Sequence, residues 1–127
     1  MLSRVVRLRL SVTLGAVLST VVLSRAAVLY AEEGTCSPRG TGNVYRYSDG
    51  GLVGSDIWSL GPAAYPDYAP CLSDSQGRAI ASCSNACRNG GVSTGQYGIA
   101  YCTANWSVYW NFNFEGAVQQ QYDCGDV

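Results

Sequence analysis

The chain has 127 residues, with eight basic residues (all arginine), nine acidic residues, six cysteines and no histidine. Without histidine and lysine it lacks the commonest general base and the Schiff-base nucleophile of enzymes. Four arginines lie in the first 31 residues, so the remainder has a net charge of 4 − 9 = −5, which disfavours binding to nucleic acid or anionic membranes.

The first 31 residues have the pattern of an export signal. Three arginines precede an uncharged apolar stretch, residues 10–23, that is shorter than the roughly 20 residues needed to span a bilayer. Small residues fit cleavage after Ala26 or Ala31, and the acidic pair after Ala31 favours the second position. We therefore expect a signal peptide over residues 1–31 and a secreted cysteine-rich domain over residues 32–127.

After the leader, a polar, glycine-rich segment over residues 32–43 is expected to form an extended arm. Short strands are predicted at residues 44–48, where tyrosines alternate with other side chains, and within residues 52–61, with an Asp-Gly-Gly turn between them. The three prolines of residues 62–70 predict a stiff loop without regular structure.

One helix is predicted over residues 74–88. Ser73 and Gln76 have the spacing of a capping box at its start, and an Asn-Gly-Gly sequence follows its end. Apolar residues recur at helical spacing and predict one buried stripe, made of Leu72, Ala79, Ile80, Cys83 and Cys87.

The strongest periodic pattern follows the helix. Over residues 100–114 the even positions are apolar and most odd positions are polar, which is typical of a half-buried antiparallel strand. Residues 118–124 are predicted to return as its partner after a three-residue connection. That connection places Phe114 opposite Val118 and Trp110 opposite Tyr122, which keeps the apolar faces together.

The even number of cysteines in a short exported chain indicates structural disulfides rather than a metal site or a redox pair. A domain of this size needs such bridges, because its hydrophobic core alone gives only marginal stability. Zinc would require clustered thiolates or histidines, and a redox pair usually has two intervening residues rather than three. No metal and no cofactor is expected. The disulfide residues are Cys36, Cys71, Cys83, Cys87, Cys102 and Cys124.

Cys83 and Cys87 lie one turn apart on the predicted helix, so their Cβ atoms are too distant to bond each other. They face the same way, toward the apolar side of the sheet where Cys102 and Cys124 also point. The favoured hypothesis is that the helix is joined to the hairpin by both bridges, which leaves Cys36 with Cys71. The sequence alone leaves other pairings open.

This pair of cysteines resembles half of the cysteine-stabilised helix and sheet motif of defensin-like peptides. The resemblance covers only residues 83–87. In that motif the partner cysteines form Cys-x-Cys on one strand, whereas Cys102 and Cys124 belong to two strands, so the activity of the family is not carried over. The composition as a whole is similar to that of small secreted cysteine-rich effectors and toxins.

These elements predict an α+β domain with one helix packed on an antiparallel sheet of about three to five strands, closed by three disulfides. Its expected function is to bind a target protein or surface outside the producing cell, as an effector, toxin-like or inhibitory molecule. The aromatic side chains of the proline-stiffened segment at residues 58–68 are candidates for contact with a protein target, since a rigid loop loses little entropy on docking.

A second hypothesis is a carbohydrate-binding module, because aromatic rings flanked by amides suit sugar rings and their hydroxyls. The tentative ligand-binding residues are Tyr97, Tyr101, Tyr109, Asn111 and Asn113, with Gln119 and Gln121 beside them. Asn105 begins an Asn-Trp-Ser glycosylation sequon on the same polar face, and a glycan there would crowd that face.

The third hypothesis is a small hydrolase that uses two carboxylates, as in glycosidic chemistry. No motif brings any two of the acidic side chains together, so no catalytic residue is predicted. The available carboxylates are Asp49, Asp56, Asp67, Asp74, Glu115, Asp123 and Asp126.

Overall fold

The computed structural model describes residues 7–9, 25–27 and 33–127. Contacts divide the chain into two compact units at Glu32. In the first unit, strand β1 (Arg7–Arg9) pairs antiparallel with strand β3 (Arg25–Ala27).

Two features predicted for the leader, the apolar stretch at residues 10–23 and the favoured cleavage position after Ala31, lie outside the described residues. In the part of the chain that the structure describes, no helix combines the length and the apolar character that crossing a membrane requires.

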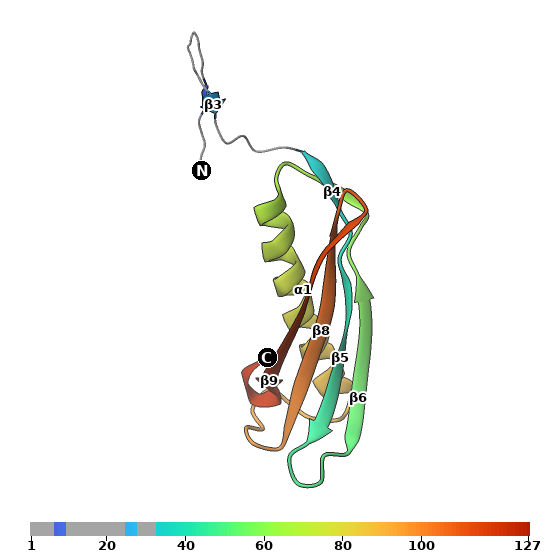
Figure 1. The fold of residues 1–127 in the computed structure, drawn as a ribbon. Coiled ribbons are helices and arrows are strands. Elements are labelled where there is room, and N and C mark those ends of the chain that lie inside the picture. Colours follow the sequence, from blue (N-terminus) through green and yellow to red (C-terminus); the bar gives the residue numbers. More distant parts are fainter. Residues whose placement is uncertain (1–6, 10–24, 28–32) are drawn as a thin grey trace. The chain divides into compact units, whose positions relative to one another are not determined.

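The second unit is a small α+β domain with one helix packed on a six-stranded antiparallel sheet and closed by three disulfides. Figure 1 shows the helix α1 lying along the strands. The predicted fold class is therefore confirmed. Its elements in chain order are β4 (Gly34–Cys36), β5 (Arg39–Arg46), β6 (Leu52–Ser59), β7 (Ala63–Tyr65), α1 (Tyr68–Asn89), β8 (Ala100–Trp110), β9 (Asn113–Asp123) and the short 3-10 helix η2 (Cys124–Asp126).

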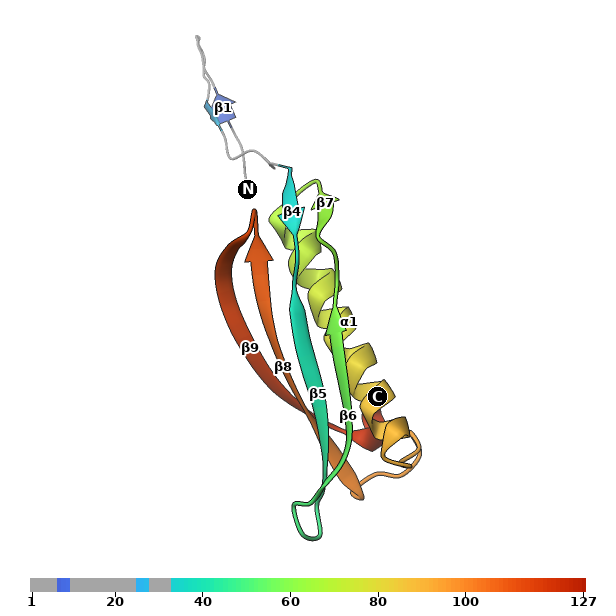
Figure 2. The same cartoon turned by 90° about the vertical axis from the view of Figure 1, so that its right-hand side faces the viewer.

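The four longer strands lie side by side in the order β6, β5, β8 and β9 (Figure 2). At one end of the sheet, β4 pairs with both β7 and β8. There β4 takes the place of β5 beside β8, and β7 takes the place of β6, so the sheet has two rows, β4 followed by β5 and β7 in line with β6. Pro38 interrupts the first row and Pro62 the second, while the Leu60 amide donates to the Pro38 carbonyl at 3.0 Å and keeps the two rows together. These interruptions make six strands where about three to five were expected.

The segment predicted to be a loop, residues 62–70, instead forms β7 and the first turn of α1. The helix begins at Tyr68 rather than residue 74, and the Asp67 carboxylate caps it by accepting from the Tyr68 amide at 2.7 Å. Pro70 lies in the first turn, where the missing N–H has no intrahelical partner to lose.

The predicted capping box is wrong, because Ser73 and Gln76 lie inside the helix. The predicted end is confirmed: the helix ends at Asn89, and Gly91 follows with a φ of 78°.

The buried side of α1 consists of small residues, namely Cys71, Ser75, Ala79, Ser82, Cys83, Ala86 and Cys87. Leu72 and Ile80, which the spacing placed in the buried stripe, are exposed. The reason is the close approach of helix and sheet: a Cβ on Gly42 of β5 would lie 3.2 Å from the Ser82 Oγ. Large side chains do not fit in this seam, so the apolar bulk of the helix faces outward.

The three disulfides are Cys36–Cys71, Cys83–Cys102 and Cys87–Cys124, which confirms the favoured pairing. One cysteine of each bridge lies in α1, and the partners lie in β4, β8 and η2. All six side chains are buried in one hydrophobic core. The helix is therefore bound covalently to the rest of the domain at three points along its length.

Over residues 100–108 and 116–122 the β8–β9 hairpin has the predicted faces but a different register, whereas Phe112 and Phe114, which were predicted on the buried face, are exposed. Trp106 lies opposite Val118 and Cys102 opposite Tyr122, so Trp110 does not pair with Tyr122. The chain turns at Asn111 and Phe112, which have φ values of 52° and 65°, rather than at residues 115–117. The shift is an even number of residues, and the apolar sides of the two strands consequently still agree.

Candidate ligand-binding face

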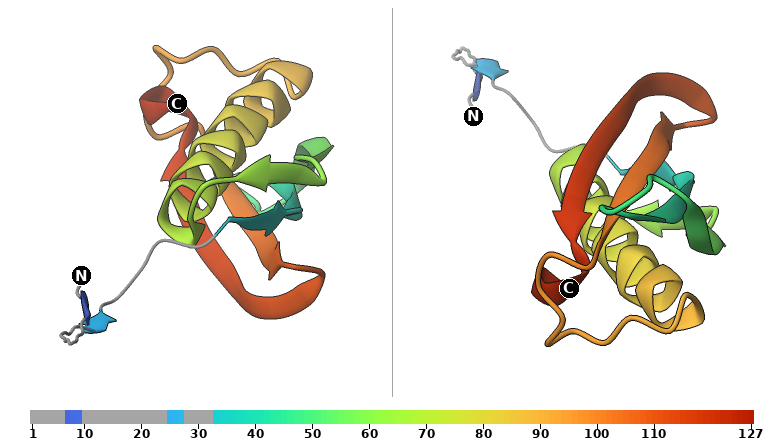
Figure 3. Two further views of the ribbon diagram at one scale, coloured as in Figure 1. Left: turned by 90° about the horizontal axis from the view of Figure 1, so that it is seen from above. Right: turned by 90° about the horizontal axis from the view of Figure 1, so that it is seen from below.

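The odd-numbered side chains of β8 point away from the helix. Each is partly exposed, whereas the even-numbered side chains from Ala100 to Val108 are buried under α1. The helix lies across one side of the sheet only (Figure 3), where it contacts β5, β6 and β8. We call the opposite side the outer face. On β8 it presents Tyr101, Thr103, Asn105, Ser107 and Tyr109.

The middle of the outer face is a hollow of about 600 Å³. One row of paired residues crosses it over all four long strands, in the order Ile57, Thr41, Asn105 and Gln119. The Gln119 Nε2 donates to the Asn105 Oδ1 at 2.8 Å, which leaves the other polar atoms of the two amides for a ligand. Ile57 is 82% exposed and adds an apolar contact at the rim. Arg39 is the one charged residue among those that line the hollow.

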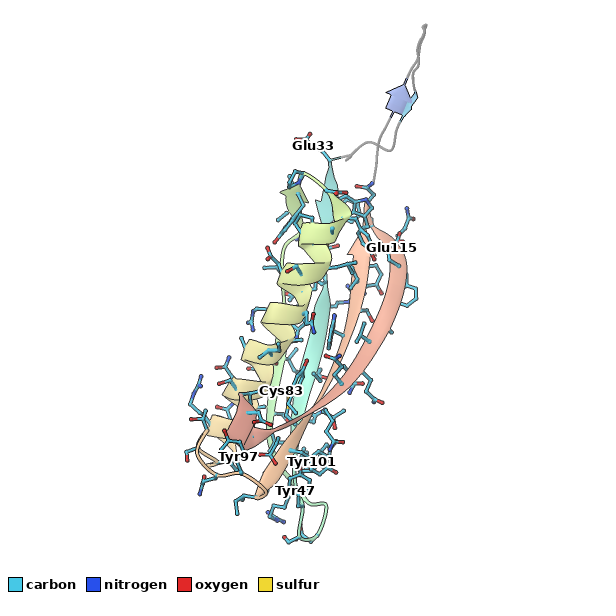
Figure 4. The ribbon with its side chains drawn as sticks, turned by 90° about the vertical axis from the view of Figure 1, so that its left-hand side faces the viewer. Glu33, Tyr47, Cys83, Tyr97, Tyr101 and Glu115 are labelled. Atoms are coloured by element: carbon cyan, nitrogen blue, oxygen red, sulfur yellow. A yellow bond between two sulfur atoms is a disulfide. The ribbon has the colours of Figure 1, made fainter. Side chains whose placement is uncertain are left out.

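Three tyrosines gather at one end of the outer face. The Tyr101 ring lies 5.6 Å from the Tyr45 ring and 4.9 Å from the Tyr47 ring, measured between centroids. Figure 4 shows Tyr47 and Tyr101 close together at the end of the domain that is far from Glu115. Desolvation and the neighbouring Asp123 carboxylate raise the pKa of Tyr47 above its ordinary value.

A second aromatic group lies at the opposite end. The Arg39 guanidinium stacks 4.5 Å above the centre of the Tyr109 ring and donates to its hydroxyl at 3.0 Å. Phe114 meets the same ring edge-on at 5.7 Å. Because the register shifts between Val108 and Tyr109, Phe114 lies opposite Tyr109 on the outer face although its number is even.

The structure brings some of the sequence-predicted ligand residues together and separates others. Tyr101, Tyr109, Gln119 and Gln121 belong to the outer face. Tyr97 lies in the loop before β8 and packs against the C-terminal turn.

Asn111 and Asn113 flank the tip of the β8–β9 hairpin. Asn111 is used by the fold itself, since its Oδ1 accepts from the Thr35 amide at 2.9 Å. Asn113 lies exposed at the start of β9. Whether either residue contacts a ligand stays a prediction.

Sequence reasoning missed Tyr45, Tyr47, Thr41 and Ile57. The alternation of Tyr45 and Tyr47 was visible in the sequence. Their position beside Tyr101 depends on the pairing of β5 with β8, and no local pattern indicates this pairing.

Asn105, the sequon asparagine, lies on the polar face as expected and lines the hollow. The sequon serine, Ser107, lies on the same face, while Trp106 between them points into the core. A glycan on Asn105 would leave the protein through the hollow and would fill it. Occupancy of this sequon stays a prediction.

The candidate catalytic carboxylates hold local structure. Asp56 accepts from the Ser82 hydroxyl at 2.8 Å, and Asp74 accepts from the Tyr65 hydroxyl at 2.6 Å. Arg46 binds Asp49 at 2.9 Å and, with the Gly51 amide, lowers the pKa of that carboxyl. No group of three or more His, Cys, Asp or Glu side chains that could hold a metal occurs within the described ranges.

The segment at residues 58–68 does not present the aromatic surface that the sequence suggested. Trp58 is only 3% exposed, and its ring lies beneath the Arg78 guanidinium at 5.7 Å. Tyr65 and Tyr68 are partly buried and pack against the core. The prediction of exposed aromatic rings on a rigid loop is therefore wrong.

Comparison of the chain with protein-family models, with curated proteins and with solved structures finds no match. The chemistry of the outer face is accordingly the basis on which a function can be assigned.

Proposed function

We propose that the protein is a secreted binding module that holds a neutral carbohydrate chain along its outer face. The observation that carries the proposal is a hollow in which hydroxyl and amide side chains lie among apolar ones, with tyrosines beyond both ends. The three disulfides are consistent with a protein made for an oxidising compartment outside the cell.

The side chains of the outer face match both the hydroxyl groups and the apolar ring faces of a sugar. Amide and hydroxyl groups both donate and accept hydrogen bonds, as the hydroxyls of a sugar ring also do. Tyrosine rings offer a flat apolar surface with a polar tip, and ordering them costs little conformational entropy. Arg39 is held against Tyr109 and is the one charged residue of the lining, so the hollow has no cluster of positive charge of the kind that selects an anionic ligand.

The spacing of the tyrosines favours a chain over a single sugar. Tyr101 and Tyr109 lie at the two ends of β8, separated by roughly 26 Å at about 3.3 Å per residue. A single ring contacts one end only. A polysaccharide contacts both tyrosine groups and the amides between them, and several weak contacts on one chain add to a useful affinity.

The other two hypotheses have less support from the geometry. A protein target was expected to contact the segment at residues 58–68, whose largest aromatic ring is buried. A carboxylate-dependent hydrolase requires two acids facing the substrate, and the residues that line the hollow include neither aspartate nor glutamate.

The test is retention on insoluble chitin and glucan and on other polysaccharides, with protein whose intact mass shows three disulfides and no glycan. The Tyr101→Ala/Tyr109→Ala double variant is expected to bind about ten-fold or more weakly, which corresponds to about 1.4 kcal/mol. Tyr97→Ala is the matched control, because it removes an exposed tyrosine that is not on the outer face.

Circular dichroism and the mass of the disulfide-bonded protein verify that each variant folds. The proposal fails if no polysaccharide retains the wild-type protein, or if the double variant is retained as well as Tyr97→Ala.

A further inference from the structure

The longest edge strand of the sheet that the structure describes is β9. Within the described residues, β9 pairs with β8 along one side and has no hydrogen-bonded strand on the other. The opposite edge, β6, is partly protected by the end of the helix. There the Asn89 side chain donates to the Ser55 carbonyl at 2.9 Å, and Gly54 lies against the Ala86 carbonyl.

The backbone groups that face the free edge can be assigned from the hydrogen bonds of β8. The Tyr109 carbonyl accepts from Ser37 and the Ile99 carbonyl accepts from Tyr47, so odd-numbered residues of this strand bond toward β4 and β5. Even-numbered residues therefore bond to β9, which engages Val118 opposite Trp106. The N–H and C=O groups of Ala117, Gln119 and Gln121 consequently point outward.

Between the register shift at Glu115 and the acidic Asp123, this edge lacks the features that usually prevent strand pairing. Natural edges carry lysine, proline or inward charges, or are very short. Residues 116–122 contain no charged residue and no proline, and β9 is 11 residues long. The acidic residues flank this stretch: Glu115 lies at the register shift, and the Asp123 carboxylate accepts from the Gly98 and Gly125 amides.

We propose that a second copy of this chain pairs with the β9 edge, strand to strand and antiparallel, about a two-fold axis at Val118. In this register Ala117 and Gln119 of each copy exchange their outward backbone hydrogen bonds. Glu115 lies opposite Gln121 of the other copy, so no like charges meet. A register centred on Gln119 instead places Glu115 opposite Asp123 and is disfavoured by repulsion.

The symmetry of this contact argues for a second copy over an unrelated peptide. A two-fold interface needs one patch that is complementary to itself. The β9 edge meets that need, because its central stretch is uncharged and Glu115 of each copy faces Gln121 of the other. The axis is perpendicular to the sheet, because antiparallel neighbours in one sheet are related in this way. The two outer faces therefore lie on the same side of one continuous sheet, with their hollows on either side of the axis.

The experiment is sedimentation velocity on the disulfide-bonded protein over a series from about 1 to 100 μM, because the concentration at which half of the chains are dimeric then reports a Kd in the micromolar range. The wild-type protein is expected to sediment with twice the monomer mass. Gln121→Glu places like charges opposite each other at both ends of the contact and is expected to weaken the dimer about ten-fold. Gln121→Lys, the matched control, faces Glu115 with an opposite charge and is expected to stay dimeric.

Hydrogen exchange provides a second measurement at the level of single amides. The outward amides of Ala117 and Gln119 are expected to exchange fast in dilute solution and slowly at about 100 μM. A wild-type protein that remains monomeric at this concentration overturns the proposal, and so do Gln121→Glu and Gln121→Lys variants that sediment alike. Neither measurement involves a carbohydrate, so the result is independent of the proposed function.

Discussion

Removal of the Cys87–Cys124 bridge is expected to cost several kcal/mol of unfolding free energy. The two cysteines are 37 positions apart in the sequence, and the bridge joins the last turn of α1 to η2. Cross-linking stabilises the native state chiefly by restricting the unfolded chain, and the effect grows with the length of the closed loop.

The neighbouring Cys83–Cys102 bridge reduces the effective loop. With that bridge intact, the shortest path from Cys87 to Cys124 runs through it and contains about 26 residues. A loop of that length corresponds to about 3.5 kcal/mol at 25 °C in the chain-entropy model. In a domain of this size, the same loss lowers Tm by about 20 °C.

The assay is urea unfolding of the Cys87→Ala/Cys124→Ala double variant beside the wild type, followed by tryptophan fluorescence. The unfolding free energy should fall by about 3.5 kcal/mol, and the slope with urea should rise because the unfolded chain is less compact. A loss below about 1 kcal/mol, together with an unchanged slope, would refute the loop-entropy reasoning.

Three further substitutions test other features by urea unfolding. Hydrogen bonds from the Gly125 amide of the C-terminal turn and the Gly98 amide of the loop before β8 lower the pKa of Asp123. This carboxyl therefore stabilises the fold above its unfolded pKa of about 3.9, and the contribution is lost as the pH falls through the lower folded value. Asp123→Asn should therefore lower stability at pH 7 and reduce its loss on acidification; parallel pH profiles for the two proteins contradict this. Asn111→Ala forces alanine to a φ of 52° and should lower the unfolding free energy by about 1–2 kcal/mol. Asn111→Gly should lower it less, because glycine adopts a positive φ without strain. Equal losses in the two variants would argue against backbone strain at this position. Gly54→Ala places a Cβ 2.2 Å from a helix carbonyl and should lower the unfolding free energy by about 1–3 kcal/mol. Gly77→Ala, at an open helix position, should raise it by roughly 0.5–1 kcal/mol. Changes of the same sign in the two variants would contradict the close packing of helix and sheet at Gly54.

The parts of the fold that could be predicted depend on local periodicity. The alternation from Ala100 to Val108 identified the buried side of β8, and the two cysteines of the helix then had to face that side. These two patterns predict that both helix cysteines bond to the hairpin segment, and the structure shows which pairs form, namely Cys83 with Cys102 and Cys87 with Cys124. Odd and even positions of a strand point to opposite sides of the sheet. The side on which a residue lies can therefore be predicted correctly even when the strand pairing is predicted with a wrong register, provided that the error is an even number of residues.

The hairpin register could not be predicted because the alternation continues past the end of the strand. Phe112 and Phe114 fall on even positions like the core residues, yet Phe112 is 70% exposed at the turn. An Asn-Phe pair is not a recognised two-residue turn, so nothing local marks the end of β8 at Trp110. The turn depends instead on the hydrogen bond between Asn111 and Thr35, which are far apart in the sequence.

The outer face was only partly predictable for the same reason. Tyr101 and Tyr109 follow from the parity of one strand, but Tyr45 joins them through pairing between distant segments. Tyr97 has an odd number like the outer-face residues of β8, but it lies before the strand begins at Ala100, where the alternation of faces does not apply. A binding surface assembled across four strands is a property of topology more than of any one segment.

The three bridges and the fully buried side chains of β8 lie on the side of the sheet that faces the helix. Substitutions at odd positions of this strand thus leave the cross-linked interior untouched. The interior can therefore stay constant while the residues of the outer face change. One scaffold can in this way acquire a new binding specificity through a few substitutions that do not lower its stability.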